Sequence, residues 1–355
     1  MHPDSESSAN QQKKQLRSAT IFETQNNHSK NMYSREELSV MIEEYIGNLP
    51  LHDAPKTLYE PILYSLEKGG KRLRPLLTLM SCNVFSNDVQ HALPCAVALE
   101  VFHNFTLLHD DIMDNASVRR GKPAVHRKWG VNSAILSGDA MMICSYRLLE
   151  SAQTQILPRI LAVFNDTSLK VCEGQQYDMD FELVERVSME EYLNMISLKT
   201  SVLLAGAAVI GAINGGASEE DCRHIYSFAM NMGMAFQIKD DLLDSYGDQN
   251  SFGKKIGGDI LEGKKTFLTT ASMESADDDT RLKLRGLLHN REMIADEKIS
   301  RVLAIYDKLG VKRRAEEAIE RYTDAAIKEL EQLSAVPERV MPLRQLALEM
   351  VGRNY

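Results

Sequence analysis

The sequence predicts an all-α protein, and three features of its 355 residues lead to this class. Glycine (20) and proline (10) are few, aromatic residues make up only 6%, and apolar residues recur at helical spacing. Sandwiches and barrels need frequent Gly and Pro turns between strands rich in aromatic and β-branched residues, so both are disfavoured. Hydrophobic residues make up 44% of the chain, which is enough for a core and excludes disorder of the whole protein.

Seven segments place apolar residues at positions i, i+3, i+4 and i+7, which form one face of a helix. In chain order they are residues 36–46, 73–85, 92–114, 133–150, 190–213, 219–244 and 315–333. Short glycine-containing breaks separate several of them, at residues 69–70, 121–123, 215–216 and 257–258. No strand alternation of convincing length appears, and no shift in composition marks a linker. We therefore expect one all-helical domain over residues 33–355, with the charged stretch 274–300 as a surface excursion.

Residues 1–32 differ from the rest of the chain, because they are rich in Ser, Asn and Gln and nearly free of large apolar residues. Such a composition predicts a disordered N-terminal tail, and translation that starts at Met32 is the alternative. The tail has no basic start followed by an apolar stretch, and it is not rich in Arg. Neither a secretory signal nor a transit peptide is therefore expected.

Charge and cysteine content limit which binding partners and which cellular compartment we expect for this protein. The chain has 41 basic and 50 acidic residues, and this net charge of −9 argues against a general binder of nucleic acid or anionic membranes. The best candidate span, residues 201–213, has 13 residues. It falls short of the roughly 20 that cross a bilayer, so we expect no membrane span. The five cysteines include no CxxC pair, which disfavours a disulfide framework or a zinc site and favours the cytoplasm.

Two identical DDxxD clusters, 130 residues apart, each close an otherwise apolar helical segment at residues 110–114 and 240–244. Carboxylates at i and i+4 share a helix face and repel each other unless a cation lies between them. Mg²⁺ suits such oxygen ligands and leaves positions for water and substrate phosphates. A solvated helix end is the alternative for one cluster alone. Acidic residues near a helix C-terminus oppose the helix dipole, however, so the repetition favours a metal site.

Separated basic groups could hold phosphates next to these carboxylates. They are GGKRLRP at residues 69–75, RRGK at 119–122, Lys199-Thr200, GKK at 253–255 and GKKT at 263–266. Arginine matches phosphate oxygens with a planar fork and lysine acts as a point charge, so the set is suited to diphosphates. Each group taken singly is more often an exposed face. The Gly-Gly-Lys stretch lacks the GxxxxGK[ST] spacing of a nucleotide-binding P-loop.

The order of these motifs, together with GQQYD at residues 174–178, resembles that of the trans-prenyltransferases, or isoprenyl diphosphate synthases, over residues 35–355. The resemblance implies the isoprenoid synthase fold, an all-α bundle around a deep central cavity, and a homodimer. It also implies condensation of isopentenyl diphosphate with an allylic diphosphate (dimethylallyl, geranyl or farnesyl). Mg²⁺ is the implied cofactor, with three ions per active site when substrate is bound.

The resemblance also implies roles for individual residues. The metal residues would be Asp110, Asp111, Asp114, Asp240, Asp241 and Asp244, with Asp111, Asp241 and Asp244 acting through water. The allylic diphosphate would contact Arg119, Lys199, Thr200, Gln237, Lys254 and Lys264, and the isopentenyl diphosphate would contact Lys71, Arg74, His103 and Arg120. Asp110, Asp114, Asp240, Arg119, Lys199 and Lys254 would be the catalytic group. Metals and cations would neutralise the leaving diphosphate as the allylic C–O bond ionises, and the released diphosphate would take the final proton.

Product length depends in this family on the side chain that stops the growing tail. Phe105 lies five residues before Asp110, about 7.5 Å along the helix, where an aromatic residue tends to mark a short product. The next position is Thr106, and the first motif carries no two-residue insertion, so both C15-type signatures are missing. We expect geranylgeranyl diphosphate (C20), with farnesyl diphosphate (C15) as the alternative. Ordinary core packing is the other interpretation of Phe105.

Other functions fit the sequence less well. A longer-chain polyprenyl synthase would share the chemistry. A class I terpene cyclase usually has an Asn/Ser/Glu metal triad in place of the second aspartate motif. A non-catalytic partner subunit usually loses aspartates, whereas both motifs are intact in this chain.

Overall fold

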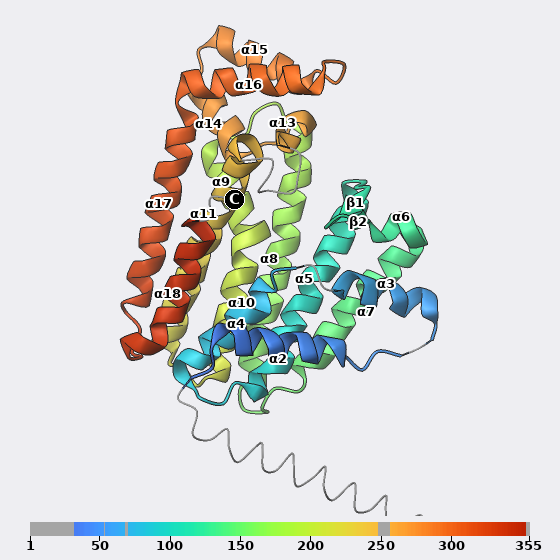
Figure 1. Cartoon of the computed structure of the whole chain (residues 1–355), viewed down its shortest axis with the longest axis vertical. Helices are drawn as coiled ribbons and strands as arrows, with labels where there is room; N and C mark the ends of the chain where they lie inside the picture. The colour runs from blue at the N-terminus through green and yellow to red at the C-terminus, as the bar shows by residue number, and fades with distance from the viewer. Residues whose placement is uncertain (1–31, 53, 68–69, 248–255, 353–355) are drawn as a thin grey trace, which may run out of the picture.

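The computed structural model describes residues 32–52, 54–67, 70–247 and 256–352. The predicted helices within these ranges are α2 (Arg35–Gly47), α4 (Leu73–Phe85), α5 (Leu93–Met113), α7 (Val131–Leu149), α11 (Glu219–Tyr246) and α17 (Val311–Leu330). The predicted helix 190–213 is α9 (Met189–Ile196) and α10 (Val202–Asn214), joined by a π-helical segment, Ser197–Ser201. The prediction of an all-α bundle is confirmed (Figure 1).

Further helices had no clear signal in the sequence. They are α3 (Lys56–Leu66), α6 (Val125–Trp129), α8 (Leu157–Leu183), α13 (Gly258–Glu262), α14 (Phe267–Ser275), α15 (Asp278–His289), α16 (Ala295–Leu309) and α18 (Pro337–Gly352), with a 3₁₀ turn at Gln90–Ala92. The expected surface excursion over 274–300 was wrong, because α15 and the start of α16 occupy most of it. Leu284, Leu287 and Leu288 of α15 are buried at helical spacing, so this charged helix still contributes to the core.

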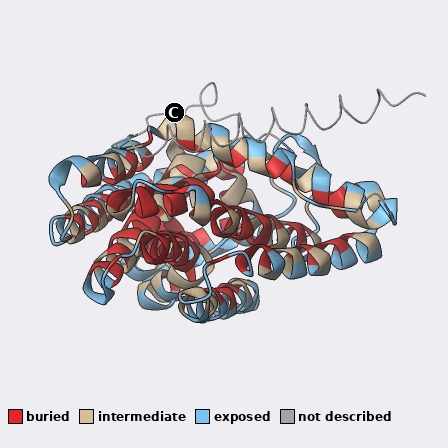
Figure 2. Ribbon diagram, turned by 90° about the horizontal axis from the view of Figure 1, so that it is seen from below, coloured by how far each residue is buried: buried red, intermediate tan, exposed pale blue. Residues whose placement is uncertain are grey.

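α10 is the central helix of the bundle, and each of its residues is buried. It packs against α4, α8 and α11, which explains why its sequence is apolar on every side. Buried residues concentrate in the interior of the bundle, and exposed residues lie on its outer turns (Figure 2). The continuous stretch Met189–Asn214 is long and apolar enough to cross a membrane, but 78% of its most apolar window is buried within the bundle. Core helices of soluble proteins pass the same test, so the stretch is weak evidence for a membrane span.

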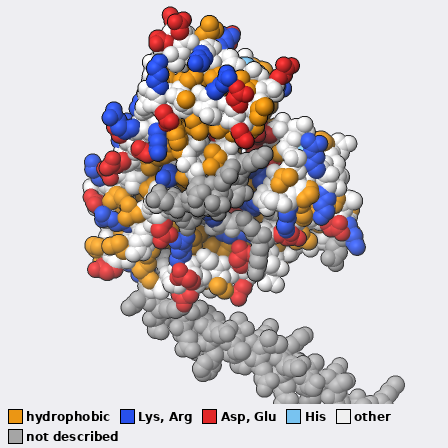
Figure 3. Space-filling model, turned by 45° about the horizontal axis from the view of Figure 1, so that its top comes forward, with side chains coloured by type: hydrophobic (Ala, Val, Ile, Leu, Met, Phe, Trp, Pro, Cys, Tyr) orange, Lys and Arg blue, Asp and Glu red, His pale blue; other side chains and the backbone are white. Residues whose placement is uncertain are grey.

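The core consists of two hydrophobic clusters. One lies among α2, α4, α5 and α10, and the other lies among α9 and the helices from α13 to α17 (Figure 1). α11 contributes to both, since Phe228 belongs to the first cluster and Ile238 to the second. On the face shown in Figure 3, acidic and basic side chains are interspersed, without a continuous basic patch.

A short hairpin follows α5 and is the exception to the helical pattern in the described chain. β1 (Val118–Arg119) pairs antiparallel with β2 (Lys122–Pro123), and the two turn residues Arg120 and Gly121 have φ angles of 52° and 75°. Positive φ at both central positions is the geometry of a tight hairpin turn. The turn therefore places Arg119 and Arg120 close to the end of α5.

Candidate active site

The first aspartate motif lies at the end of α5, where two cations from other elements meet it. Asp110 and Asp111 are in the last turn, and Asp114 is the residue that ends the helix. Arg119 donates from Nε to Asp111 Oδ1 at 2.8 Å and from a terminal nitrogen to Asp110 Oδ2 at 3.2 Å. Lys199 Nζ lies 3.5 Å from Asp110 Oδ1. The first motif is thus neutralised by side chains that the sequence predicts to bind diphosphate.

The electrostatics of this end of the site favour charged lysines. Burial opposes the charge of Lys199, but Asp110 and Asp178 outweigh it and raise the pKa of this lysine. Burial likewise opposes the charge of Lys264, and Glu262 and Asp259 raise its pKa. Both ammonium groups are therefore charged at neutral pH, and each is ion-paired with a carboxylate of the protein.

Lys199 owes its position to the π-helical segment and to a close approach by α8. A Cβ at Gly174 of α8 would lie 2.2 Å from the backbone nitrogen of Lys199, so only glycine fits there. One turn later, Asp178 accepts a hydrogen bond from Lys199 Nζ at 2.5 Å. Asp178 closes the GQQYD motif at residues 174–178, but the sequence predicted no role for it. An acidic residue one turn after a helix glycine was the available signal.

The second aspartate motif, on α11, is held by uncharged donors. Asp241 is 5% exposed. Its Oδ2 accepts from the Tyr192 hydroxyl at 2.5 Å and from the Phe267 backbone N–H at 2.8 Å, and its Oδ1 accepts from Gln237 Nε2 at 3.0 Å. Asp240 is exposed. The two neighbouring aspartates are thus in opposite environments.

The rest of the second motif connects to the basic segment that follows it. Asp244 Oδ2 accepts the backbone N–H of Asp259 at 3.0 Å, and the Oγ1 of Thr200 donates to Gln237 Oε1 at 3.0 Å. Burial raises the pKa of Asp241 to about 6, against the hydrogen bonds that lower it. Burial and the nearby Asp244 raise the pKa of Asp259 to about 8. Asp259 was missed in the sequence because a single acidic residue between two lysine groups is not distinctive.

A second group of cations lies on α4, α5 and the hairpin. The buried Nε of Arg74 has no hydrogen-bond partner within the described part of the chain. Burial lowers the pKa of Arg74 to about 10. Burial and the adjacent Arg74 and Arg120 lower the pKa of His103 well below its usual value. The site thus combines two arginines with a neutral imidazole.

The buried Glu100 organises these cations. Its Oε1 accepts from Arg72 at 2.9 Å and from Asn104 Nδ2 at 3.0 Å, while Asn104 Oδ1 lies 3.4 Å from a terminal nitrogen of Arg120. Arg72 also pairs with Glu43 of α2 at 2.9 Å. Lys71, predicted to act with this group, is exposed and precedes α4 by two residues. Lys254 lies outside the described residues.

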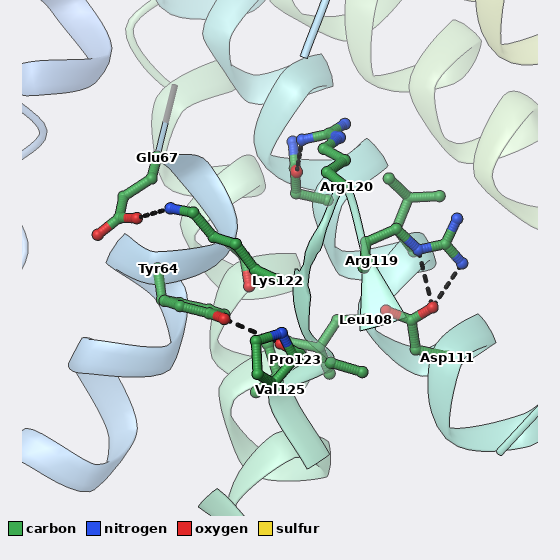
Figure 4. Close-up of a pocket in the computed structure, with 13 residues that line it drawn as sticks. Tyr64, Glu67, Leu108, Asp111, Arg119, Arg120, Lys122, Pro123 and Val125 are labelled. Atoms are coloured by element: carbon green, nitrogen blue, oxygen red, sulfur yellow. Dashed lines mark hydrogen bonds and ion pairs between the residues drawn. The ribbon is translucent and has the colours of Figure 1, made fainter. Parts of the chain in front are cut away.

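A pocket opens beside the hairpin, between α3 and the end of α5 (Figure 4). Arg119 and Asp111 point toward each other on one side, and Lys122 points toward Glu67 on the other. The Tyr64 hydroxyl donates to the Pro123 carbonyl at 2.9 Å and ties the hairpin to α3. The two arginines of the hairpin, Arg119 and Arg120, thus form part of the pocket lining.

The donor chemistry of the two motifs fits a magnesium site. Carboxylate oxygens are the hard ligands that Mg²⁺ prefers, and Asp114 and Asp240 are exposed. Among the described residues, no group of three or more carboxylate, histidine or cysteine side chains is arranged to hold a metal ion.

Comparison with known proteins identifies the family. A polyprenyl synthetase family model matches residues 55–306. The chain belongs to the polyprenyl synthetase family. The recognition of a trans-isoprenyl diphosphate synthase from its motifs is therefore confirmed, and so is the prediction of a trans-prenyltransferase.

Individual relatives of the polyprenyl synthetase family cover nearly the whole chain. A geranylgeranyl diphosphate synthase of Methanosarcina mazei is 36% identical over 85% of this chain and 91% of its own length. A geranylfarnesyl diphosphate synthase of Natronomonas pharaonis is 33% identical over 90% of this chain and 96% of its own. A crystal structure of a geranylgeranyl pyrophosphate synthase superimposes with a TM-score of 0.87 at 45% identity, covering 91% of this chain and all of the other.

Proposed function

We propose that this protein condenses isopentenyl diphosphate head-to-tail with allylic diphosphates, in a Mg²⁺-dependent reaction that yields geranylgeranyl diphosphate. The observation that carries the proposal is the meeting of Asp110 with Arg119 and Lys199, which joins metal-type ligands and diphosphate-type cations at one point. The relatives named as geranylgeranyl diphosphate synthases support a C20 product. Farnesyl diphosphate is the alternative product. The relative named as a geranylfarnesyl diphosphate synthase makes the next longer product a further candidate.

The described residues suggest how the chain handles the allylic substrate. Bound Mg²⁺, up to three ions held by the aspartates of the two motifs, would supply positive charge for the diphosphate leaving group. Arg119 and Lys199 would turn from Asp110 and Asp111 to the diphosphate and stabilise the charge that develops on it. Lys264, with its raised pKa, would add a further cation.

The second cation group would hold the isopentenyl diphosphate. Arg74 offers an unpaired Nε–H within the described part of the chain, and Arg120 reaches the same region from the hairpin. Neutral His103 would donate one hydrogen bond without adding charge. The double bond of this substrate would attack the allylic cation, and the released diphosphate would take the proton.

We also propose a homodimer formed through α7 and α8. Apolar side chains are exposed on both helices: Leu136 and Ile143, seven residues apart on α7, are 60% and 62% exposed, and Leu169 of α8 is 62% exposed. The Tyr146 hydroxyl donates to Asn165 at 2.6 Å, which links the two helices beside these residues. Contiguous exposed apolar side chains often mark an interface.

Light scattering after size exclusion tests the dimer. L136D should shift the protein to monomer, while L282D, at a leucine of α15 that is 71% exposed, should remain dimeric. An unchanged mass for L136D would contradict this interface. The five cysteines are all free, which supports a cytoplasmic location for the enzyme.

The activity test uses the purified full-length protein. Each reaction would contain the protein, isopentenyl diphosphate, Mg²⁺ and one allylic diphosphate: dimethylallyl, geranyl or farnesyl diphosphate. The products would be identified by mass spectrometry. A dominant C20 product is expected. A dominant C15 product would replace the proposed product and keep the chemistry. No condensation with any starter would overturn the proposed function.

A further inference from the structure

We propose that Tyr192 is a positioning residue of the second aspartate motif: its hydroxyl, through the buried carboxylate of Asp241, fixes the orientation in which Asp240 and Asp244 meet the metal and the allylic diphosphate. The proposal rests on the proposed function. It assigns Asp241 to holding the site together, in place of the water-mediated metal role expected from the sequence.

The contacts of Asp241 carry the first step. Three donors from three elements occupy its two oxygens: Tyr192 of α9, Gln237 of α11 and the backbone N–H of Phe267, the first residue of α14. Tyr192 is 1% exposed and Asp241 5%, so water has little access to this group. A buried carboxylate surrounded by protein donors is anchored in place, and each lost donor leaves a costly unsatisfied oxygen.

Helix geometry turns this anchor into control of its neighbours. Successive helical residues are rotated by about 100° around the axis, so a fixed Asp241 sets the directions of Asp240 and Asp244. Asp240, one residue earlier, is exposed, and Asp244 contacts the backbone of Asp259. The rotation of α11 at this point therefore depends on the donors that hold Asp241.

The same hydrogen bonds connect α11 to the two segments that carry predicted ligands of the allylic diphosphate, the π-helical segment and the basic segment before α14. Tyr192 is on α9, which continues directly into the π-helical segment that carries Lys199 and Thr200. Thr200 itself donates to Gln237. Phe267 begins α14 directly after the basic segment with Lys264. Loss of the Tyr192 hydroxyl should therefore disturb allylic binding and leave the Arg74 and His103 side unaffected.

Tyr306 offers a matched control within the same hydrophobic cluster. It is 0% exposed, and among the described residues its hydroxyl is hydrogen-bonded to Thr269 Oγ1 at 2.8 Å, which is not a carboxylate. Y192F and Y306F therefore each remove one buried hydroxyl with one hydrogen bond. A general effect on folding should appear in both variants, whereas an effect on the second motif should appear in Y192F alone.

The experiment measures kinetics and binding on the full chain. For Y192F we expect the KM for the allylic diphosphate, and the Kd for inorganic pyrophosphate with Mg²⁺ measured by calorimetry, to rise about tenfold. The KM for isopentenyl diphosphate should stay within about twofold, and Y306F should match the wild type in all three. Equal changes in both variants, or equal shifts for both substrates, would overturn the proposal.

A second variant covers the case in which Y192F does not fold. D241N keeps an acceptor oxygen for Tyr192 and Phe267 and should show the same selective, roughly tenfold weakening. If D241N instead abolishes Mg²⁺-pyrophosphate binding, as we expect for D240N, Asp241 is a metal ligand and the proposal fails. A wild type that binds Mg²⁺-pyrophosphate but condenses no substrate would reject the proposed function and leave this comparison of variants interpretable.

Discussion

The two aspartate motifs share one sequence pattern but are held in different ways. At the end of α5, Asp110 and Asp111 face the charged side chains of Arg119 and Lys199. On α11, Asp241 is held by a phenol, an amide and a backbone N–H. Charged partners can be exchanged for a metal ion and a diphosphate, whereas neutral donors remain in place when these bind. The difference suggests an adjustable half and a rigid half of one site.

The largest expected effect comes from removing a predicted ligand of the adjustable half. D110A should lower kcat by about a thousandfold, because the loss of about 4 kcal/mol of charge stabilisation corresponds to that factor. Steady-state assays with saturating Mg²⁺ measure it, and D279A, at an exposed aspartate of α15, is the control. Near-normal turnover of D110A would remove the metal role from this motif.

The next effect separates the two halves directly. K199M removes a cation from Asp110 and should lower kcat by about a hundredfold, since one charge-stabilising donor is lost. Mg²⁺ should nevertheless bind the substrate-free variant more tightly, because the ammonium no longer competes for the carboxylate. Q237M removes a neutral donor from the second motif and should not tighten Mg²⁺ binding. Calorimetry that finds the two variants alike would remove the distinction between the halves.

The third prediction concerns product length and a part of α5 that lies before the first aspartate motif. Phe105 packs against Phe102 and His109, with ring centroids 5.6 and 4.8 Å apart. F105A should lengthen the main product by about one C5 unit, because a tail that grows along α5 would meet a smaller side chain. Mass spectrometry of the products measures the shift. F181A, in the other hydrophobic cluster, should leave the product unchanged, and an unaltered product from F105A would assign Phe105 to core packing.

The smallest effect concerns His103 on the helix of the first motif. This half-buried histidine lies next to arginines, and its burial together with their charges lowers its pKa. The folded state keeps His103 neutral while the unfolded chain protonates it near pH 6.5, so stability is lost as pH falls below about 6.5. Between about pH 7.5 and 5.5, the wild type should lose about 2 °C more in Tm than H103Q. Parallel melting curves for H103Q and wild type would contradict the neutral imidazole.

The sequence predicted the strongly apolar helices because burial on one face leaves a periodic pattern. It missed α8, where exposed Leu169 and Leu183 obscure the buried face, and it missed α15, where charges surround three buried leucines. The π-helical segment depends on packing against Gly174 and has no local signal. The spacing of apolar residues alone could not predict α8, α15 or the π-helical segment.

The candidate site was predictable where chemistry repeats along the chain. Six aspartates and most cations were found from spacing and motif order, and the structure brings Asp110, Arg119 and Lys199 together. Their roles stay predictions. Tyr192 could not be singled out, because it meets Asp241 across 49 residues and a buried tyrosine in an apolar helix is unremarkable. Such a partner is visible only when the chain is folded.

The contact between Gly174 and the backbone of Lys199 has a consequence for how this enzyme can change. A single methyl group there, without charge or donor, would push the π-helical segment and move the ammonium group away from Asp110 and Asp178. A residue that touches no substrate can therefore tolerate substitution as poorly as the ligands themselves. A mutational survey that ranked positions by chemical reactivity would overlook Gly174, whereas a survey ranked by the space around each backbone position would place it among the least tolerant.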